Sequence, residues 1–334
     1  MRTIPHLFIA LLTILLVACE KEIEFNGKDV EPVLVANCIA CTDSTLEVKV
    51  TASLFFLSNI DTFKTITNAT AKLYAEGIFI ENLAPMGNGL YKSTYTPRAN
   101  ETIRLSISAP GYTAITMEDI FPDSPIHVQV DTTFFLPNSG TFAYDGGRWE
   151  DTVMVYDTVY LYDLTLKFTV SFSNIPRNKD FFRLLVSKRA TNYEDSTYRG
   201  GWSINRTNFD DIVFGKNSNL DGIISESPSD YYNVFSDELI DGKTHSIRFE
   251  EHLNVYGTKR ANGNVRILPY FRNLFTIEVQ PISKNYYLYL KSLQNLENSD
   301  FFMSEPVQLF TNVQNGLGLF GSRKRHSIKI DCPF

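Results

Sequence analysis

The chain has few of the residues that enzymes commonly use for catalysis and metal binding. Its 334 residues include five histidines, four cysteines and two tryptophans, and no HExxH, GxSxG or P-loop motif. His245 and His252 are seven residues apart in an alternating segment, so their side chains are expected on opposite faces of a strand. We therefore expect no catalytic residues, no metal site and no cofactor, and a protein that is not an enzyme.

Two pairs of adjacent acidic residues are candidates for acid–base chemistry, Asp210-Asp211 and Asp237-Glu238. A glycosidase needs two carboxylates about 5–9.5 Å apart that flank one bond. Neighbours on one strand point to opposite faces, so neither pair fits that geometry. We interpret both pairs as solvated loop acids.

Positive charge is also scarce. The chain has 31 Lys and Arg against 38 Asp and Glu, a formal net charge of −7, and its basic run is the short segment RKRH at 323–326. An acidic chain without a basic stripe is not expected to bind nucleic acid.

The longest apolar run is too short to cross a bilayer. Residues 4–18 have the length of a signal-peptide hydrophobic region, whereas a membrane-spanning helix needs about 20 residues. The run ends in LVAC at 16–19, which has the spacing of a bacterial lipobox. We expect residues 1–18 to be a signal peptide, cleaved between Ala18 and Cys19, with lipid attached to Cys19. The alternative is an ordinary secretory signal that happens to contain a cysteine.

Charged residues follow the cysteine directly. Glu20, Lys21, Glu22 and Glu24 begin a polar segment, residues 19–31, that is typical of a solvated tether. An acidic run at this place is similar to the signal with which Bacteroidota move lipoproteins to the cell surface. We expect an outer-membrane protein that is lipid-anchored and faces the cell exterior.

Lipid attachment to Cys19 would leave three thiols, Cys38, Cys41 and Cys332, which can form at most one disulfide. Whether they do is left open by the sequence. Cys38 and Cys41 have the spacing of a redox motif or half a zinc site, but a second cysteine pair and a βαβ context are missing. We interpret them as small buried residues at a strand end.

From residue 33 onward the dominant hydrophobic period is two, which indicates strands. We expect an all-β protein whose residues 32–122 form an immunoglobulin-like β-sandwich, because short alternating segments there are separated by Gly, Pro and Asn turns. Residues 119–125, which contain two prolines, are interpreted as its boundary. The alternating segments are 46–56, 69–83, 87–97 and 101–117.

Residues 123–158 are expected to form connecting strands and a hairpin with a long exposed tip. Further alternation predicts a second, larger antiparallel β domain over 159–334. Near 283–298 the period changes, since Tyr286, Leu290 and Leu293 recur at steps of three and four residues behind Ser283, a suitable N-cap. This segment predicts one amphipathic helix that packs on a sheet.

The two tryptophans, Trp149 and Trp202, each lie just behind a Gly-Gly pair and are expected in loops. Because a large exposed aromatic side chain is costly to hydrate, both are candidate interaction residues. The alternative is that each folds back over its own sheet.

Four blocks of the sequence carry a resemblance to a known family: 19–37, 234–243, 283–294 and 304–321. Together they resemble a Bacteroidota family of outer-membrane lipoproteins known as domain of unknown function 4249. Its members look like surface lipoproteins whose genes often lie beside TonB-dependent receptors. The resemblance brings no catalytic residues with it. The last block includes NGLGLFG at 315–321, whose glycines permit positive φ or close backbone approach.

These observations predict a non-enzymatic accessory subunit of a TonB-dependent transporter or a related outer-membrane complex. The alternative is a surface module that itself captures glycan or peptide for import. A large apolar patch would favour the accessory subunit, and exposed aromatics around a cleft would favour the ligand-binding module.

Overall fold

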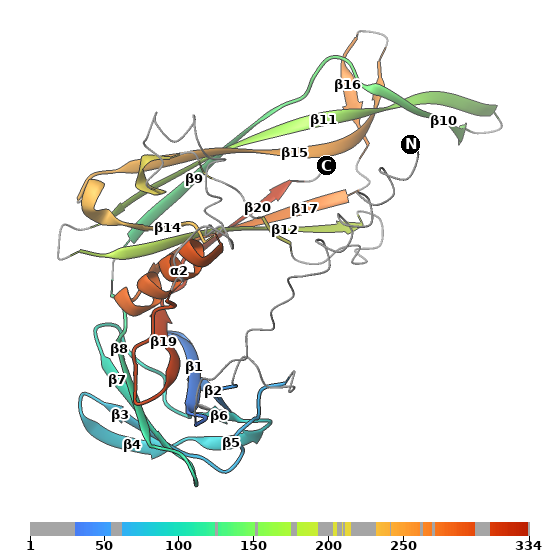
Figure 1. Cartoon of the computed structure of the whole chain (residues 1–334). Coiled ribbons are helices and arrows are strands. Elements are labelled where there is room, and N and C mark those ends of the chain that lie inside the picture. Colours follow the sequence, from blue (N-terminus) through green and yellow to red (C-terminus); the bar gives the residue numbers. More distant parts are fainter. Residues whose placement is uncertain are drawn as a thin grey trace, which may run out of the picture.

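The computed structural model describes residues 31–54, 62–123, 126–150, 153–174, 179–192, 203–205, 209, 211–214, 232–240, 242–260, 263–268, 271–297 and 308–332. In this part of the chain, strands in three sheets form two sandwiches, and one α-helix lies beside them (Figure 1). The all-β class expected from the period of two is confirmed.

The first sandwich pairs a layer of mostly antiparallel strands with a second antiparallel sheet. One layer has the order β19-β1-β2-β6-β5, and the facing sheet has the order β18-β8-β7-β3-β4. The strands are β1 (Leu34–Cys41), β2 (Glu47–Ala52), β3 (Thr70–Ala75), β4 (Ile78–Asn82), β5 (Ala84–Gly87), β6 (Leu90–Lys92), β7 (Thr102–Ser108), β8 (Ile115–Ile120), β18 (Val313–Gln314) and β19 (Leu317–Arg323).

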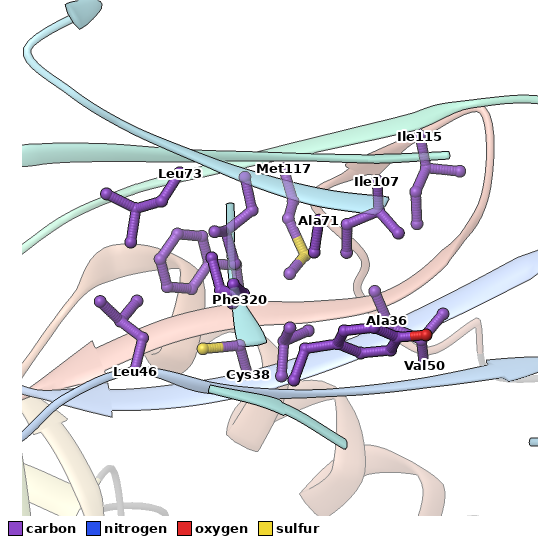
Figure 2. Close-up of a cluster of buried hydrophobic side chains, with 14 of the residues drawn as sticks. Ala36, Cys38, Leu46, Val50, Ala71, Leu73, Ile107, Ile115, Met117 and Phe320 are labelled. Atoms are coloured by element: carbon purple, nitrogen blue, oxygen red, sulfur yellow. The ribbon is translucent and has the colours of Figure 1, made fainter. Parts of the chain in front are cut away.

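Alternation along these strands builds the first core. Every second residue of β1 from Leu34 to Ala40 is buried, and β7 repeats the pattern at Ile103, Leu105 and Ile107. Figure 2 shows such side chains from both layers, together with Phe320 of β19, meeting in one cluster. The period of two in the sequence is therefore the direct cause of this core.

The C-terminal strands belong to the first sandwich, which differs from the expected domain division. β19 runs parallel to β1 with Val35 opposite Leu317 and Cys41 opposite Arg323, and β18 pairs with β8. Residues 313–323, expected in the second domain, thus enter both layers of the first. Pairing between strands so far apart in the chain leaves no local pattern in the sequence.

The second sandwich packs a long-stranded sheet against the rest of the sheet that contains β19. Phe168 of the long-stranded sheet contacts Phe275 of the opposite layer, with ring centroids 5.2 Å apart, and stacks on Phe249 at 4.9 Å. The long-stranded sheet consists of β9 (Ile126–Phe135), β10 (Thr141–Glu150), β11 (Val153–Asn174), β15 (His245–Lys259) and β16 (Val265–Ile267). The opposite layer consists of β12 (Phe181–Asn192), β13 (Ser203–Asn205), β14 (Val234–Ser236), β17 (Phe271–Ile282) and β20 (Ser327–Cys332).

The predicted helix is present as α2 (Lys284–Glu297), and its N-cap is also confirmed. The amide of Tyr286 donates to Ser283 Oγ at 3.3 Å, and Tyr286 and Leu290 are buried. Two short 3-10 turns, η1 (Ile212–Phe214) and η3 (Asp237–Leu239), complete the described elements.

Two glycines of β19 allow close approach on its two sides. Gly318 has φ +117, and an added Cβ there would overlap the Ala36 carbonyl of β1. A Cβ on Gly321 would lie 2.8 Å from Tyr286 Cβ of α2. The glycines of NGLGLFG thus serve the close packing expected from the sequence.

We predict that Gly318→Ala lowers the free energy of unfolding by about 3 kcal/mol or more, because it adds an overlap to a strained positive φ. Gly111→Ala is the matched control, since Gly111 has φ +82 but nothing within 4 Å of an added Cβ. Gly111→Ala should lower the free energy of unfolding by about 1 kcal/mol. Denaturant unfolding of each variant measures its change in stability. Equal losses of stability in Gly318→Ala and Gly111→Ala would contradict the close approach of β19 to β1.

Candidate functional site

The residues expected to anchor and export the protein lie outside the described part of the chain. They are Ala18, Cys19, Glu20, Lys21, Glu22 and Glu24, and the same holds for Trp202. Their roles stay predictions from the sequence.

Trp149 is in a strand, which corrects its expected place in a loop. It belongs to β10, where it lies opposite Met154 of β11. Gly146 and Gly147 of the same segment are also paired, opposite Asp157 and Tyr156. Most of the segment expected to be a long hairpin tip is therefore a paired strand, residues 141–150. An edge strand tolerates glycines, although glycines in a sequence usually indicate a loop.

His245 and His252 lie on opposite faces of β15, as expected. His245 Nε2 lies 2.8 Å from Asp211 Oδ1, and its ring contacts Phe172 in the core. His252 Nδ1 lies 3.1 Å from Asp163 Oδ1 and is exposed. Each pair is an isolated contact. No three His, Cys, Asp or Glu side chains among the described residues could hold a metal ion together.

The expectation of solvated acids was wrong for Asp237, and Asp210 lies outside the described residues. Asp237 is buried, and its Oδ1 accepts the Asp180 amide at 3.0 Å. Glu238 is exposed and forms an ion pair with Lys179. The two adjacent carboxylates therefore have different surroundings and share no site.

All three described cysteines are free and buried. Cys38 points into the first core (Figure 2), whereas Cys41, three residues along the same strand, faces the opposite side. Burial raises the pKa of Cys38 and Cys41, and raises that of Cys332 to about 11. The interpretation of Cys38 and Cys41 as small buried residues is confirmed. The disulfide question left open by the sequence is answered by three free thiols, Cys332 included.

Large aromatic side chains are exposed where β9 ends and β10 begins. We define the β9–β10 edge as Phe134, Phe135, Phe142 and Tyr144. The first three are each about 60% exposed, and Tyr144 is 41% exposed. β9 and β10 both pair with the same side of β11, and among the described strands none pairs with their outer sides. The edge combines exposed rings with edge strands that can accept a further strand.

Register fixes how these rings are spread. Phe134 and Phe142 lie opposite Leu166 and Tyr160, six residues apart on β11, so the edge extends about 20 Å at roughly 3.3 Å per residue. Tyr256 of β15 lies beside Tyr144, with ring centroids 6.2 Å apart. Phe134 and Phe142 therefore share one face of the sheet, whereas Phe135, opposite Thr165, points to the other. Together the rings form an exposed apolar edge, the feature closest to the patch expected to favour an accessory subunit.

A second feature, the Asp119 junction, lies where β8, β19 and α2 meet. We define it as Asp119, Ser283, Asn285, Asn312 and Ser322. Asp119 Oδ2 accepts from Ser322 Oγ at 2.6 Å, and Oδ1 accepts from Asn285 Nδ2 at 2.9 Å. Asn312 donates to the carbonyl oxygens of Glu118 and Phe320 at 3.0 and 2.8 Å.

This carboxylate is not among the residues predicted from the sequence, because residues 119–125 were interpreted as a boundary. Asp119 continues the inward-facing row of β8 behind Ile115 and Met117, and it is only 3% exposed. The alternation of ITMED at 115–119 was the available signal for an inward-facing acid.

A family comparison adds to these observations. The model of a family described as a domain of unknown function (DUF4249) matches residues 20–329. The chain belongs to this family. No curated protein and no solved structure shows significant similarity to it.

Three of the blocks that suggested the DUF4249 family meet in one apolar cluster beside the Asp119 junction. Val234, Tyr286 and Leu319 come from these three blocks and are buried together with Ile282 and Leu290. Separate parts of the DUF4249 match therefore build one junction between the sandwiches. In the described residues, no helix is long and apolar enough to span a membrane.

Burial raises the pKa of Asp119 to about 7 in this DUF4249 protein, although hydrogen bonds from Ser322, Ser283 and Asn285 favour the carboxylate. Between about pH 4 and pH 7 the folded state holds a proton that the unfolded state has lost. Asp119 therefore contributes stability below about pH 4 that is lost as the pH rises through 7.

We predict that Asp119→Asn removes this contribution to the pH dependence. The amide stays neutral at every pH, and Ser322 Oγ can donate instead to the Ile120 carbonyl, which lies 3.3 Å away. From pH 4 to pH 8, wild type should lose stability relative to the variant, as measured by thermal unfolding at each pH. Parallel curves would show that Asp119 titrates normally.

Proposed function

We propose that this protein is a lipid-anchored lipoprotein of the outer membrane that faces the cell exterior and acts as a non-enzymatic accessory subunit of a TonB-dependent transporter or a related complex. The observation that carries the proposal is the exposed aromatic β9–β10 edge. The lipobox at 16–19 and the acidic residues that follow it support the proposed location at the cell surface. The resemblance to Bacteroidota lipoproteins supports a TonB-dependent receptor as the kind of partner.

The β9–β10 edge has the composition of a docking surface. Phe135 and Phe142 are 60% and 59% exposed, and monomeric proteins seldom leave extended apolar surfaces in contact with water. Aromatic side chains are enriched among the residues that dominate binding energy at interfaces. An edge strand additionally offers main-chain hydrogen bonds to a segment of a partner.

The groups that could perform chemistry support a non-enzymatic role. Asp211 is hydrogen-bonded to His245, Asp163 to His252, and Asp237 to a backbone amide. Each of these carboxylates therefore has its own hydrogen-bond partner within the fold. The Asp119 carboxylate is buried in hydrogen bonds at a junction of elements.

We predict that Cys19→Ala prevents incorporation of radiolabelled palmitate and moves the protein from membrane to soluble fractions, because the thiol that takes the diacylglyceryl group is lost. Cys332→Ala is the matched control: it removes a buried thiol and should keep both label and membrane attachment. A labelled, membrane-bound Cys19→Ala protein would contradict the anchor.

We predict that Phe135→Ser combined with Phe142→Ser reduces co-purification of a TonB-dependent receptor from detergent-solubilised outer membrane by about tenfold or more, since truncating an interface anchor typically costs more than about 1 kcal/mol. Leu239→Ser is the matched control, because Leu239 is equally exposed but lies in η3, outside the edge. Mass spectrometry identifies the receptor, and thermal unfolding checks that both variants fold.

Equal recovery of the receptor with both variants would remove the β9–β10 edge as the docking surface. Absence of any receptor from the wild-type preparation would contradict the accessory role. The alternative, a module that captures glycan or peptide by itself, would then be the better supported function.

A further inference from the structure

We infer that the outer edge of the first sandwich, formed by β4 and β5, rests on the lipid surface to which the anchor is attached. We define this membrane edge as Ile78, Phe79, Ile80 and Met86. The inference rests on the proposed lipid anchor and adds to it a second, non-covalent contact with lipid.

The membrane edge is apolar and protrudes. Ile78 and Met86 are 68% and 60% exposed, and Phe79 and Ile80 between them are also exposed. An ordinary strand would bury alternate residues, but the β3–β4 ladder is irregular between Leu73 and Tyr74. As a result three consecutive apolar side chains of β4 are exposed.

The two strands are outermost in both layers. β4 ends the order β18-β8-β7-β3-β4, and β5 ends the order β1-β2-β6-β5. They follow each other along the chain through Leu83, which is buried. Figure 1 shows β4 and β5 at the end of the molecule away from the second sandwich, so these two strands form a tip.

The position of the proposed lipid anchor favours lipid as the partner that contacts the membrane edge. Cys19 precedes Leu34, the first residue of β1, by 15 residues, which can span at most about 50 Å. β5 is the third strand from β1, a separation of about 14 Å at roughly 4.8 Å per strand. A chain lipidated at Cys19 thus holds the first sandwich within reach of the membrane, and the β4–β5 tip belongs to the same sandwich as the strand that carries the tether.

The chemistry of the tip also fits lipid better than a protein partner. It is mainly aliphatic, whereas the β9–β10 edge carries the aromatic residues that dominate protein interfaces. Charge contributes little, because Lys92 of the neighbouring strand is paired with Glu47 at 2.6 Å and the whole chain is acidic. The contact is therefore apolar insertion, insensitive to salt and strengthened by the anchor that holds it in place.

The test uses the full-length lipoprotein added in detergent to preformed phosphatidylethanolamine–phosphatidylglycerol vesicles that contain doxyl-labelled lipid. Ile78→Cys and, as a matched control, Phe135→Cys are labelled with the fluorophore NBD. The thiols of Cys38, Cys41 and Cys332 are buried, so labelling is selective. Met86→Cys provides a second position on the same edge.

We expect the label at Ile78 and Met86 to be quenched by doxyl lipid several-fold more than the label at Phe135, with a blue-shifted emission that persists at high salt. Vesicle flotation, run in parallel, reports the anchor. Floating protein with equally weak quenching at all three positions would overturn the membrane edge and leave the proposed function intact. Protein that does not float would contradict the anchor and the membrane edge together.

Discussion

Parallel pairing of β19 with β1 is the constraint on which the described structure depends. Seven consecutive residue pairs join β1, the first of the described strands, to β19, one of the last, and Arg323 at the end of β19 also pairs with Ile282 of β17. Phe320 enters the first core while Leu319 packs beside α2 on the other side. One strand therefore takes part in the first core, the junction cluster and the sheet of the second sandwich.

The Asp119 junction ties β8, β19 and α2 together by hydrogen bonds. A carboxylate replaces an apolar residue at the end of the inward row of β8, and its oxygens accept from Ser322 of β19 and Asn285 of α2. Because a buried polar group with unmade hydrogen bonds is costly, these bonds favour one relative arrangement of the three elements. Ser283 adds a further tie, since its hydroxyl accepts the amides of both Tyr286 and Ser322.

This arrangement relates the proposed anchor to the proposed docking surface. The tether enters at β1, beside β19, and the β9–β10 edge belongs to the sandwich on the other side of the junction. Figure 1 shows the β4–β5 tip and β10 toward opposite ends of the molecule. A chain held to lipid at the tip would thus present its aromatic edge away from the membrane surface.

Local patterns predicted much of this fold. The period of two predicted the strands, the change of period and Ser283 predicted α2, and the shortage of partner ligands predicted that Cys38 and Cys41 are buried residues. What local patterns miss is pairing over long sequence separation, and so residues 313–323 were expected in the wrong sandwich. Asp119 and β10 were missed for a related reason. An acidic residue and the Gly146-Gly147 pair are local signals for the end of a strand, but pairing with neighbouring strands keeps both segments in strands. The immunoglobulin-like character of the first sandwich stays a prediction.

Native-state hydrogen exchange across a denaturant series tests most directly whether β19 joins the two sandwiches into one cooperative unit. If it does, amides of β1, β19 and β17 should be among the slowest to exchange and should reach the same free energy of opening, equal to that of global unfolding. Two distinct free energies, with β1 remaining protected after β17 has opened, would show that the sandwiches unfold independently and would contradict the central place of β19.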